Sequence, residues 1–219
     1  MPTIDSASLN GLLSSPLALI AGALAALLVV LVALAIRRTD AARRLLSVVI
    51  VLMVVGAGIA AILDRMAKDG RAAERRALSQ RYTDLAAAAL APGSPLACLD
   101  GGAGEAVEAA CEKAVFAGPQ ATASAVTYTA ARLALLADGL AFARNYDPGF
   151  EKRLVGLRRA IELDRFGMVA HLLAVRDACT VERCAAFALL KDTSVIKVNL
   201  KSKAFDQYVA RDVAEWGKT

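Results

Sequence analysis

The chain has 219 residues, 57% of them hydrophobic, and its 26 lysines and arginines outnumber its 21 aspartates and glutamates, which gives a formal net charge of +5. Most of the excess lies in one stretch, because residues 65–81 hold six cations against two acids, a net +4, whereas residues 82–219 hold 16 of each. A neutral distal region lacks the basic footprint of a nucleic-acid-binding domain, so the charge argues against a nucleic-acid partner.

Two apolar runs without a charged residue, 17–36 and 45–63, dominate the N-terminal part of the chain. Each contains twelve Leu, Ile or Val residues, and a helix of about 20 residues crosses a hydrocarbon core of about 30 Å. Together they predict a transmembrane hairpin over 17–63, preceded by a polar segment over 1–16. The polar segment contains no Lys or Arg, so it lacks the basic start of a cleavable signal peptide and the first run is expected to be an anchor.

Basic residues flank both runs, and lysine and arginine beside a membrane contact lipid phosphates. The residues expected to contact lipid headgroups are Arg37, Arg38, Arg43, Arg44, Arg65, Lys68, Arg71, Arg75 and Arg76. Four arginines between the runs, against no cation before them, place the turn in the cytoplasm and both ends outside. The six cations of residues 65–81 argue for the opposite orientation, but the first helix usually dominates and long domains translocate largely regardless of charge.

Four cysteines in the distal part of the chain bear on the compartment: Cys98, Cys111, Cys179 and Cys184. An even number in two sequence-near groups, with none in the membrane runs, is typical of disulfides in an oxidising compartment. The alternative is a set of buried free thiols in a cytoplasmic domain, and the pairing scheme stays open. Charge and cysteines together predict a two-pass protein of a bacterial inner membrane with its C-terminal domain in the periplasm.

Residues 64–91 are rich in Ala, Arg and Leu and contain no strong helix breaker except Gly70. The second membrane helix is therefore expected to continue as a juxtamembrane helical stalk. Its apolar stripe is too thin for a coiled coil, which suggests a solvated spacer. The Pro-Gly-Ser-Pro sequence at 92–95 ends this helix and marks the domain boundary, with a soluble domain over 92–219.

Beyond this boundary the periodic stretches have the 3.6-residue repeat of amphipathic helices, and no run alternates with period two, so the predicted fold class is all-α. Helices are expected over 104–117, 120–144, 150–163, 166–177, 181–190 and 195–216. Asp147 is expected to cap the third of them, with Pro148 in its first turn. In the last one, the residues expected to point inward are Val198, Phe205, Val209, Val213 and Trp216.

The spacing of Cys179 and Cys184 constrains the local structure if the two are bonded. Within a continuous helix a five-residue separation puts the backbones about 8 Å apart, which is too far for a strain-free disulfide. If Thr180 caps a helix that starts at Val181, the two cysteines occupy the positions that touch in a hydrophobic staple. A disulfide here therefore predicts a helix start between them.

The sequence assigns no catalytic, cofactor-binding or metal residue, and no cofactor is expected. His171, the only histidine, lies in an apolar stretch and is interpreted as a core residue. The cysteine spacing differs from the paired C-x-x-C of zinc sites, and the glycines at 101–104 lack the Lys-Ser/Thr of a P-loop. Glu162 and Asp164 lie among arginines, which is more typical of surface ion pairs than of a catalytic pair.

The sequences SPLACLD at 94–100, AACEKAVF at 109–116 and RRAIELDR at 158–165 resemble those of conserved two-helix inner-membrane proteins of alphaproteobacterial type, a group with no assigned function. The resemblance extends over most of the soluble domain. It implies a bacterial envelope setting and no particular activity, and no functional residue follows from it.

These features predict a membrane-anchored, non-catalytic interaction module, an accessory or scaffold subunit of an inner-membrane assembly. Its expected partners are membrane lipid and either a membrane protein or further copies of the chain. The alternative is a membrane-tethered sensor that binds an apolar ligand such as a lipid, in a pocket lined by Leu136, Leu140 and Phe142. An envelope enzyme that uses His171 or a redox-active Cys179–Cys184 pair fits less well, because redox pairs typically have C-x-x-C spacing.

Overall fold

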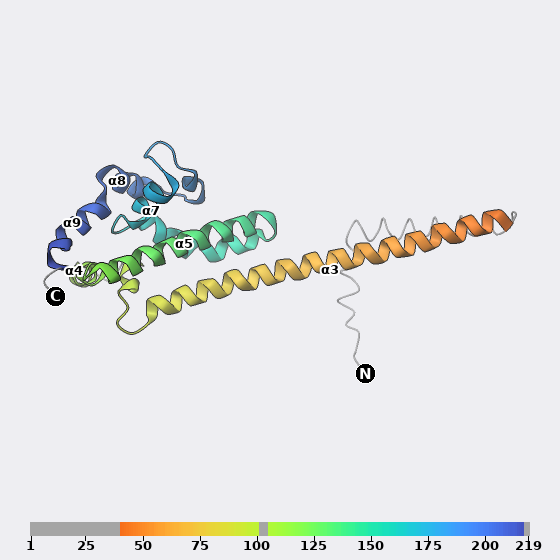
Figure 1. Ribbon diagram of the computed structural model, residues 1–219, viewed down its shortest axis with the longest axis horizontal. Helices are drawn as coiled ribbons and strands as arrows, with labels where there is room; N and C mark the ends of the chain where they lie inside the picture. The colour runs from red at the N-terminus through yellow and green to blue at the C-terminus, as the bar shows by residue number, and fades with distance from the viewer. Residues whose placement is uncertain (1–39, 101–104, 217–219) are drawn as a thin grey trace. The chain divides into compact units, whose positions relative to one another are not determined.

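The computed structural model (Figure 1) describes residues 40–100 and 105–216, and every regular element in these ranges is helical, which confirms the all-α prediction. The first apolar run, 17–36, lies outside the described residues, and with it the predicted hairpin. The elements are α3 (Asp40–Leu90), η1 (Pro95–Asp100), α4 (Glu105–Val115), α5 (Pro119–Asn145), η2 (Pro148–Leu154), α6 (Val155–Leu163), α7 (Met168–Asp177), η3 (Ala185–Leu189), α8 (Ser194–Ser202) and α9 (Ala204–Trp216), where η denotes a 3-10 helix.

The second apolar run and the predicted stalk form one helix, α3, of 51 residues. It passes through Gly56, Gly58 and Gly70, which each cost about 1 kcal/mol in a helix but do not break it. It ends at Leu90, just before the Pro-Gly sequence, and Gly93 adopts a positive φ of 77° in the turn that follows. Prolines and a left-handed glycine therefore stop the helix where the sequence predicts.

The chain divides into two compact units, Met1–Lys68 and Asp69–Thr219, so the second unit includes part of α3. The reason is that Leu78, on α3, is 4% exposed and packs in the core cluster built on Leu133, Leu135 and Leu136 of α5. Ala89 packs in a second cluster around Phe116. The stretch expected to be a solvated spacer thus contributes Leu78 and Ala89 to the core, although most of its other residues are exposed, and the second compact unit begins within it.

Helix α5 is the centre of the second unit (Figure 1), with α3 on one side of it and α7 on the other. At Gly139 it approaches η2 so closely that an added Cβ would lie 2.8 Å from Leu154 Cδ1. Asp147 begins η2 as predicted, because its side chain accepts a hydrogen bond from the Gly149 N–H and Pro148 follows it. The predicted helix over 150–163 is divided, however, into η2 and α6.

The predicted C-terminal helix over 195–216 is broken at Lys203, which adopts a left-handed φ of 51° between α8 and α9. Ile196 is fully buried and Phe205 is 8% exposed, yet nine residues correspond to about two and a half helical turns, so one straight helix would point them in opposite directions. The break lets both enter the core. The predicted inward face of this helix is wrong in part, because Val198 and Val213 are exposed.

Candidate functional site

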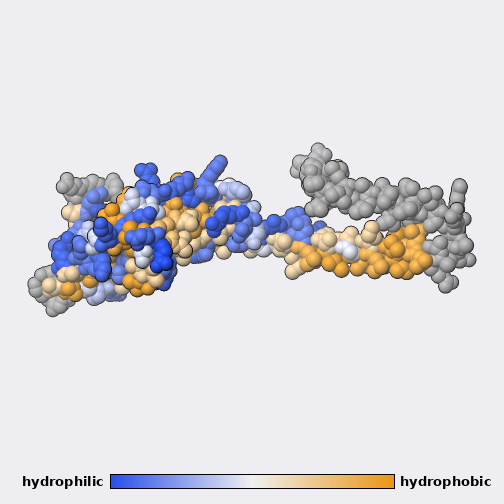
Figure 2. Space-filling model, turned by 90° about the horizontal axis from the view of Figure 1, so that it is seen from above, coloured by the Kyte–Doolittle hydropathy of each residue, from blue (hydrophilic) through white to orange (hydrophobic). Residues whose placement is uncertain are grey.

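The first half of α3 carries an unburied apolar surface. Twelve large apolar side chains between Leu45 and Met66 are 44–70% exposed, and Figure 2 shows them as a band of hydrophobic surface. A soluble protein rarely exposes so many contiguous apolar side chains, and a patch of this size marks contact with a membrane or another protein.

Two described helices, α3 and α5, are long and apolar enough to cross a membrane. In the most apolar window of α5, 56% of the residues are buried in the domain, whereas the window of α3 is not buried at all. Helix α5 is therefore the core helix of the second unit. Among the described helices, α3 is the one whose most apolar window packs in no protein core.

The expected lipid-headgroup residues are described in part. Arg37 and Arg38 lie outside the described residues, and the side chains of Arg43 and Arg44 are not described. On α3, Lys68 forms an ion pair with Asp64, at 2.6 Å, and Arg75 lies 3.7 Å from Asp147. The remaining headgroup candidates on α3 are the exposed residues Arg65, Arg71 and Arg76.

All four cysteines are joined in disulfides between sequence neighbours, Cys98 to Cys111 and Cys179 to Cys184. The Cα–Cα distances are 5.2 and 4.6 Å, within the usual range for disulfides. Because the thiols are bonded to each other, they do not form a thiolate metal site. The first bridge ties η1 to α4, and the second closes the turn after α7.

The predicted helix start between Cys179 and Cys184 is wrong. The Thr180 N–H donates to the Arg183 carbonyl, and the Arg183 N–H donates to the Thr180 hydroxyl, so these residues close a tight turn. The next helix, η3, begins only after Cys184. A non-helical turn brings the cysteines together equally well, and the Thr180 hydroxyl closes that turn instead of capping a helix.

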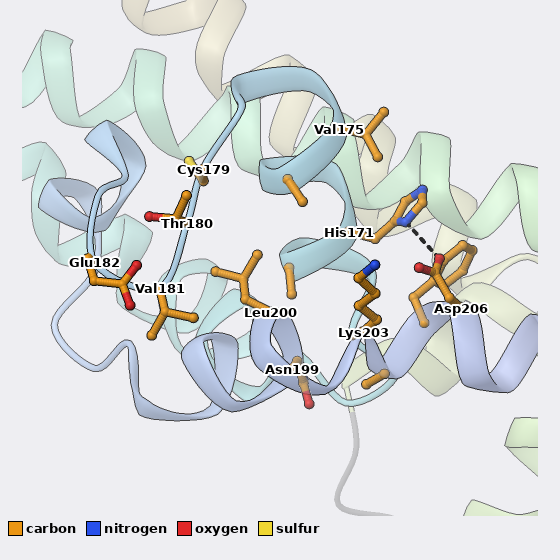
Figure 3. Close-up of a pocket in the computed structure, with 15 residues that line it drawn as sticks. His171, Val175, Cys179, Thr180, Val181, Glu182, Asn199, Leu200, Lys203 and Asp206 are labelled. Atoms are coloured by element: carbon orange, nitrogen blue, oxygen red, sulfur yellow. Dashed lines mark ion pairs between the residues drawn. The ribbon is translucent and has the colours of Figure 1, made fainter.

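A groove of about 470 Å³ opens between α7, the disulfide-bonded turn, α8 and the start of α9 (Figure 3). The α7 side chains that face it include Ala170 and Ala174, which are too small to fill the space against α8. Leu200 and Phe205 add apolar surface from the other wall. The groove exists because small residues on one helix face larger residues on the next.

His171 lies at the rim of this groove and is not the core residue that the sequence suggests, because its side chain is 29% exposed. Its ring packs against that of Phe205 in a tilted arrangement, with a centroid separation of 4.4 Å. Its Nδ1 lies 3.4 Å from the Asp206 carboxylate (Figure 3). Glu182 and Lys203 also line the groove.

Glu162 and Asp164 are neither a catalytic pair nor surface ion pairs. Half-buried Glu162 accepts solvent-exposed hydrogen bonds from the backbone N–H groups of Lys191 and Asp192. Asp164 is 4% exposed and caps α7 by accepting from the N–H groups of Val169 and Ala170. Burial raises the pKa of Asp164 to about 6, although its hydrogen bonds favour the ionised form.

Comparisons of the chain with protein-family models, curated proteins and solved structures find no match. The geometry of the chain is therefore the basis for any functional argument.

The pocket expected for an apolar ligand is filled, because Leu136, Leu140 and Phe142 are at most 7% exposed and belong to the core. The observed groove lies elsewhere, and the sequence gives no signal for it. Glu182, Lys203 and Asp206 are isolated charged residues, and folding brings three separate segments together around the groove.

Proposed function

We propose that this protein is anchored in a bacterial inner membrane and that its α-helical domain acts by binding a partner, as a non-catalytic accessory or scaffold subunit. The observation that carries the proposal is the unburied apolar half of α3. Residues 45–63 of a helix span about 28 Å, which matches a hydrocarbon core of about 30 Å. At roughly −0.3 to −0.6 kcal/mol for each Leu, Ile or Val, insertion is favoured by several kcal/mol.

In this proposal residues 17–36 form the other helix of a two-pass hairpin, with the turn in the cytoplasm and the domain in the periplasm. The four arginines of the turn support this orientation. The disulfides Cys98–Cys111 and Cys179–Cys184 support an oxidising compartment. The resemblance to alphaproteobacterial inner-membrane proteins agrees with the same setting.

The position of each basic residue along α3 refines the expected lipid contacts. A helix rises about 1.5 Å per residue, so Arg65 and Lys68 follow Leu63 within about 8 Å, the depth of a headgroup layer. Arg75 and Arg76 follow Leu63 by about 18–20 Å. We therefore assign headgroup contact first to Arg65 and Lys68, with Arg71 at the edge of reach.

Gly56 and Ala60 provide the small-xxx-small spacing that lets two membrane helices approach closely. Among the described residues, no atom outside the local helix lies within 4 Å of a Cβ built at Gly56, so this face of α3 is open to them. The face suits either the other helix of the hairpin or a second subunit.

Native mass spectrometry of the full chain, extracted from bacterial inner membranes in mild detergent, tests the proposal. We expect a stoichiometric complex with a membrane protein or with further copies of the chain. Gly56→Leu is expected to weaken it, because the larger side chain blocks close helix approach. Gly58→Leu is the matched control, because residue 58 lies about 200° around the helix. A monomer without a stoichiometric partner in all mild detergents would contradict the proposal.

A further inference from the structure

The groove beside α7 has an apolar middle and charged ends. Leu200 and Val181 lie between Glu182 at one end and Lys203 at the other (Figure 3). Within the described part of the chain, neither Glu182 nor Lys203 forms an ion pair. Both charges are therefore available to a bound molecule, and they have opposite signs.

The end that holds Lys203 also contains the His171–Asp206 pair. The Asp206 carboxylate faces the His171 ring, whereas Lys203 is the lysine that lines this end and forms no ion pair with a carboxylate of the described residues. A ligand carboxylate is thus attracted to the Lys203 end. A ligand ammonium is attracted to Glu182.

The groove is held in shape before any ligand arrives. The Cys179–Cys184 disulfide and the paired hydrogen bonds of Thr180 and Arg183 fix the turn that carries Glu182. The Asn199 amide donates to both the main-chain and side-chain oxygens of Asp164, which ties α8 to the end of α6. A preformed site loses little conformational freedom on binding.

We propose that this groove binds a small linear zwitterion with an apolar body, such as a short peptide of apolar residues. The ligand's ammonium lies at Glu182, its side chains lie on Leu200 and Val181, and its carboxylate lies at Lys203. The volume of about 470 Å³ is in the range of small-ligand sites. The interior of a larger protein chain carries neither terminal charge, so it matches the two ends less well.

Isothermal titration calorimetry of the full chain in nanodiscs tests this binding with three probes, and empty nanodiscs serve as the blank. The probes are the dipeptide Leu-Leu, its N-acetyl form, which lacks the ammonium, and its C-terminal amide, which lacks the carboxylate. We expect saturable binding of Leu-Leu and a loss of roughly two- to fivefold in affinity for each capped form, the range of an exposed ion pair.

Variants of Glu182 and Lys203 identify which end of the groove binds the ligand's ammonium and which binds its carboxylate. In Glu182→Gln, the free and N-acetyl dipeptides should bind equally, while the amide still binds more weakly. In Lys203→Asn, the free and amide forms should bind equally. Asparagine suits this position because Lys203 has a φ of 51° and asparagine tolerates the left-handed region, so the fold is kept.

Lys201→Ala and Glu74→Gln are the charge-matched controls, because both residues are exposed and neither lines the groove. They should leave all three affinities unchanged. Absence of saturable binding, or binding that ignores the caps and both groove variants, would overturn the proposal. Either result would leave the anchoring function intact, because that function is tested by membrane extraction.

Discussion

Asp164 shows how a single side chain can hold three helices together. It ends α6 with a left-handed φ of 34°, a conformation that aspartate tolerates better than most residues. Its carboxylate accepts from the N–H groups of Val169, at 2.8 Å, and Ala170, at 3.1 Å, on α7. The third donor is the Asn199 amide of α8, at 3.0 Å. The two backbone donors depend on this carboxylate, whereas the Asn199 amide also donates to the Asp164 main-chain oxygen, at 2.7 Å.

Replacement of Asp164 by alanine is expected to lower the free energy of unfolding at pH 7 by about 2 kcal/mol or more. The reason is that the backbone N–H groups of Val169 and Ala170 lose their acceptor in a buried place, where water does not replace it, while Asn199 keeps only the Asp164 main-chain oxygen. Glu162→Ala is the matched control, because Glu162 also accepts two backbone hydrogen bonds, but both bonds are exposed to solvent. Chemical denaturation should give a loss below about 1 kcal/mol for the control.

Wild type and Asp164→Ala together test the pH dependence of stability. Burial raises the pKa of Asp164 to about 6 from 3.8, so the folded state binds the proton more tightly than the unfolded state. The stability that the folded state gains from protonated Asp164 is fully present below about pH 4 and is lost as the pH rises through about 6. The stability difference between wild type and Asp164→Ala should therefore shrink by up to about 3 kcal/mol over this range. A constant difference would contradict the assignment.

At the scale of elements, one disulfide links two helices and the other closes a turn. Cys98–Cys111 spans 13 residues of sequence and joins η1 to α4, while Cys179–Cys184 spans five and closes the turn before η3. At the break between α8 and α9, a glycine rather than a disulfide determines how closely two segments pack. Gly167 lets the start of α9 lie against the turn before α7, since an added Cβ at Gly167 would lie 2.8 Å from the Phe205 nitrogen.

Removal of each disulfide should destabilise the domain to a different extent. Closing a chain loop restricts the unfolded state more when the loop is longer, which gives about 3 kcal/mol for Cys98–Cys111 and about 2 kcal/mol for Cys179–Cys184. We expect Cys98→Ala/Cys111→Ala to lower the melting temperature more than Cys179→Ala/Cys184→Ala, measured on the full chain in detergent. The reverse order would show that native contacts of the second turn outweigh the chain entropy.

At the scale of the whole molecule, the second compact unit starts within α3. Its two core clusters include Leu78, Leu85 and Ala89, and Arg81 of α3 forms an ion pair with Asp138 of α5 at 2.7 Å. The apolar first half of α3 contributes to neither cluster. The fold of this unit is therefore expected to be independent of residues 45–63.

Two fragments test this boundary. Residues 69–219 should be soluble and should unfold cooperatively, because both core clusters are complete. Residues 92–219 should be less stable by several kcal/mol or should aggregate, because loss of Leu78 alone leaves a cavity worth about 2–5 kcal/mol. Circular dichroism melting and size-exclusion chromatography compare the two. Equal stability would place the domain boundary at the Pro-Gly sequence after all.

The sequence by itself determined the helical class, the apolar half of α3, the helix end before Gly93 and the cap at Asp147, because these depend on local periodicity and on residues that act within a few positions. Only the tertiary structure decided the break at Lys203, the burial of Leu78 and Asp164, and the groove with Glu182 and Lys203 at its ends. The physical reason is that burial and charge proximity depend on which distant segments meet. Neither the helical repeat nor residue spacing records which helices will pack together.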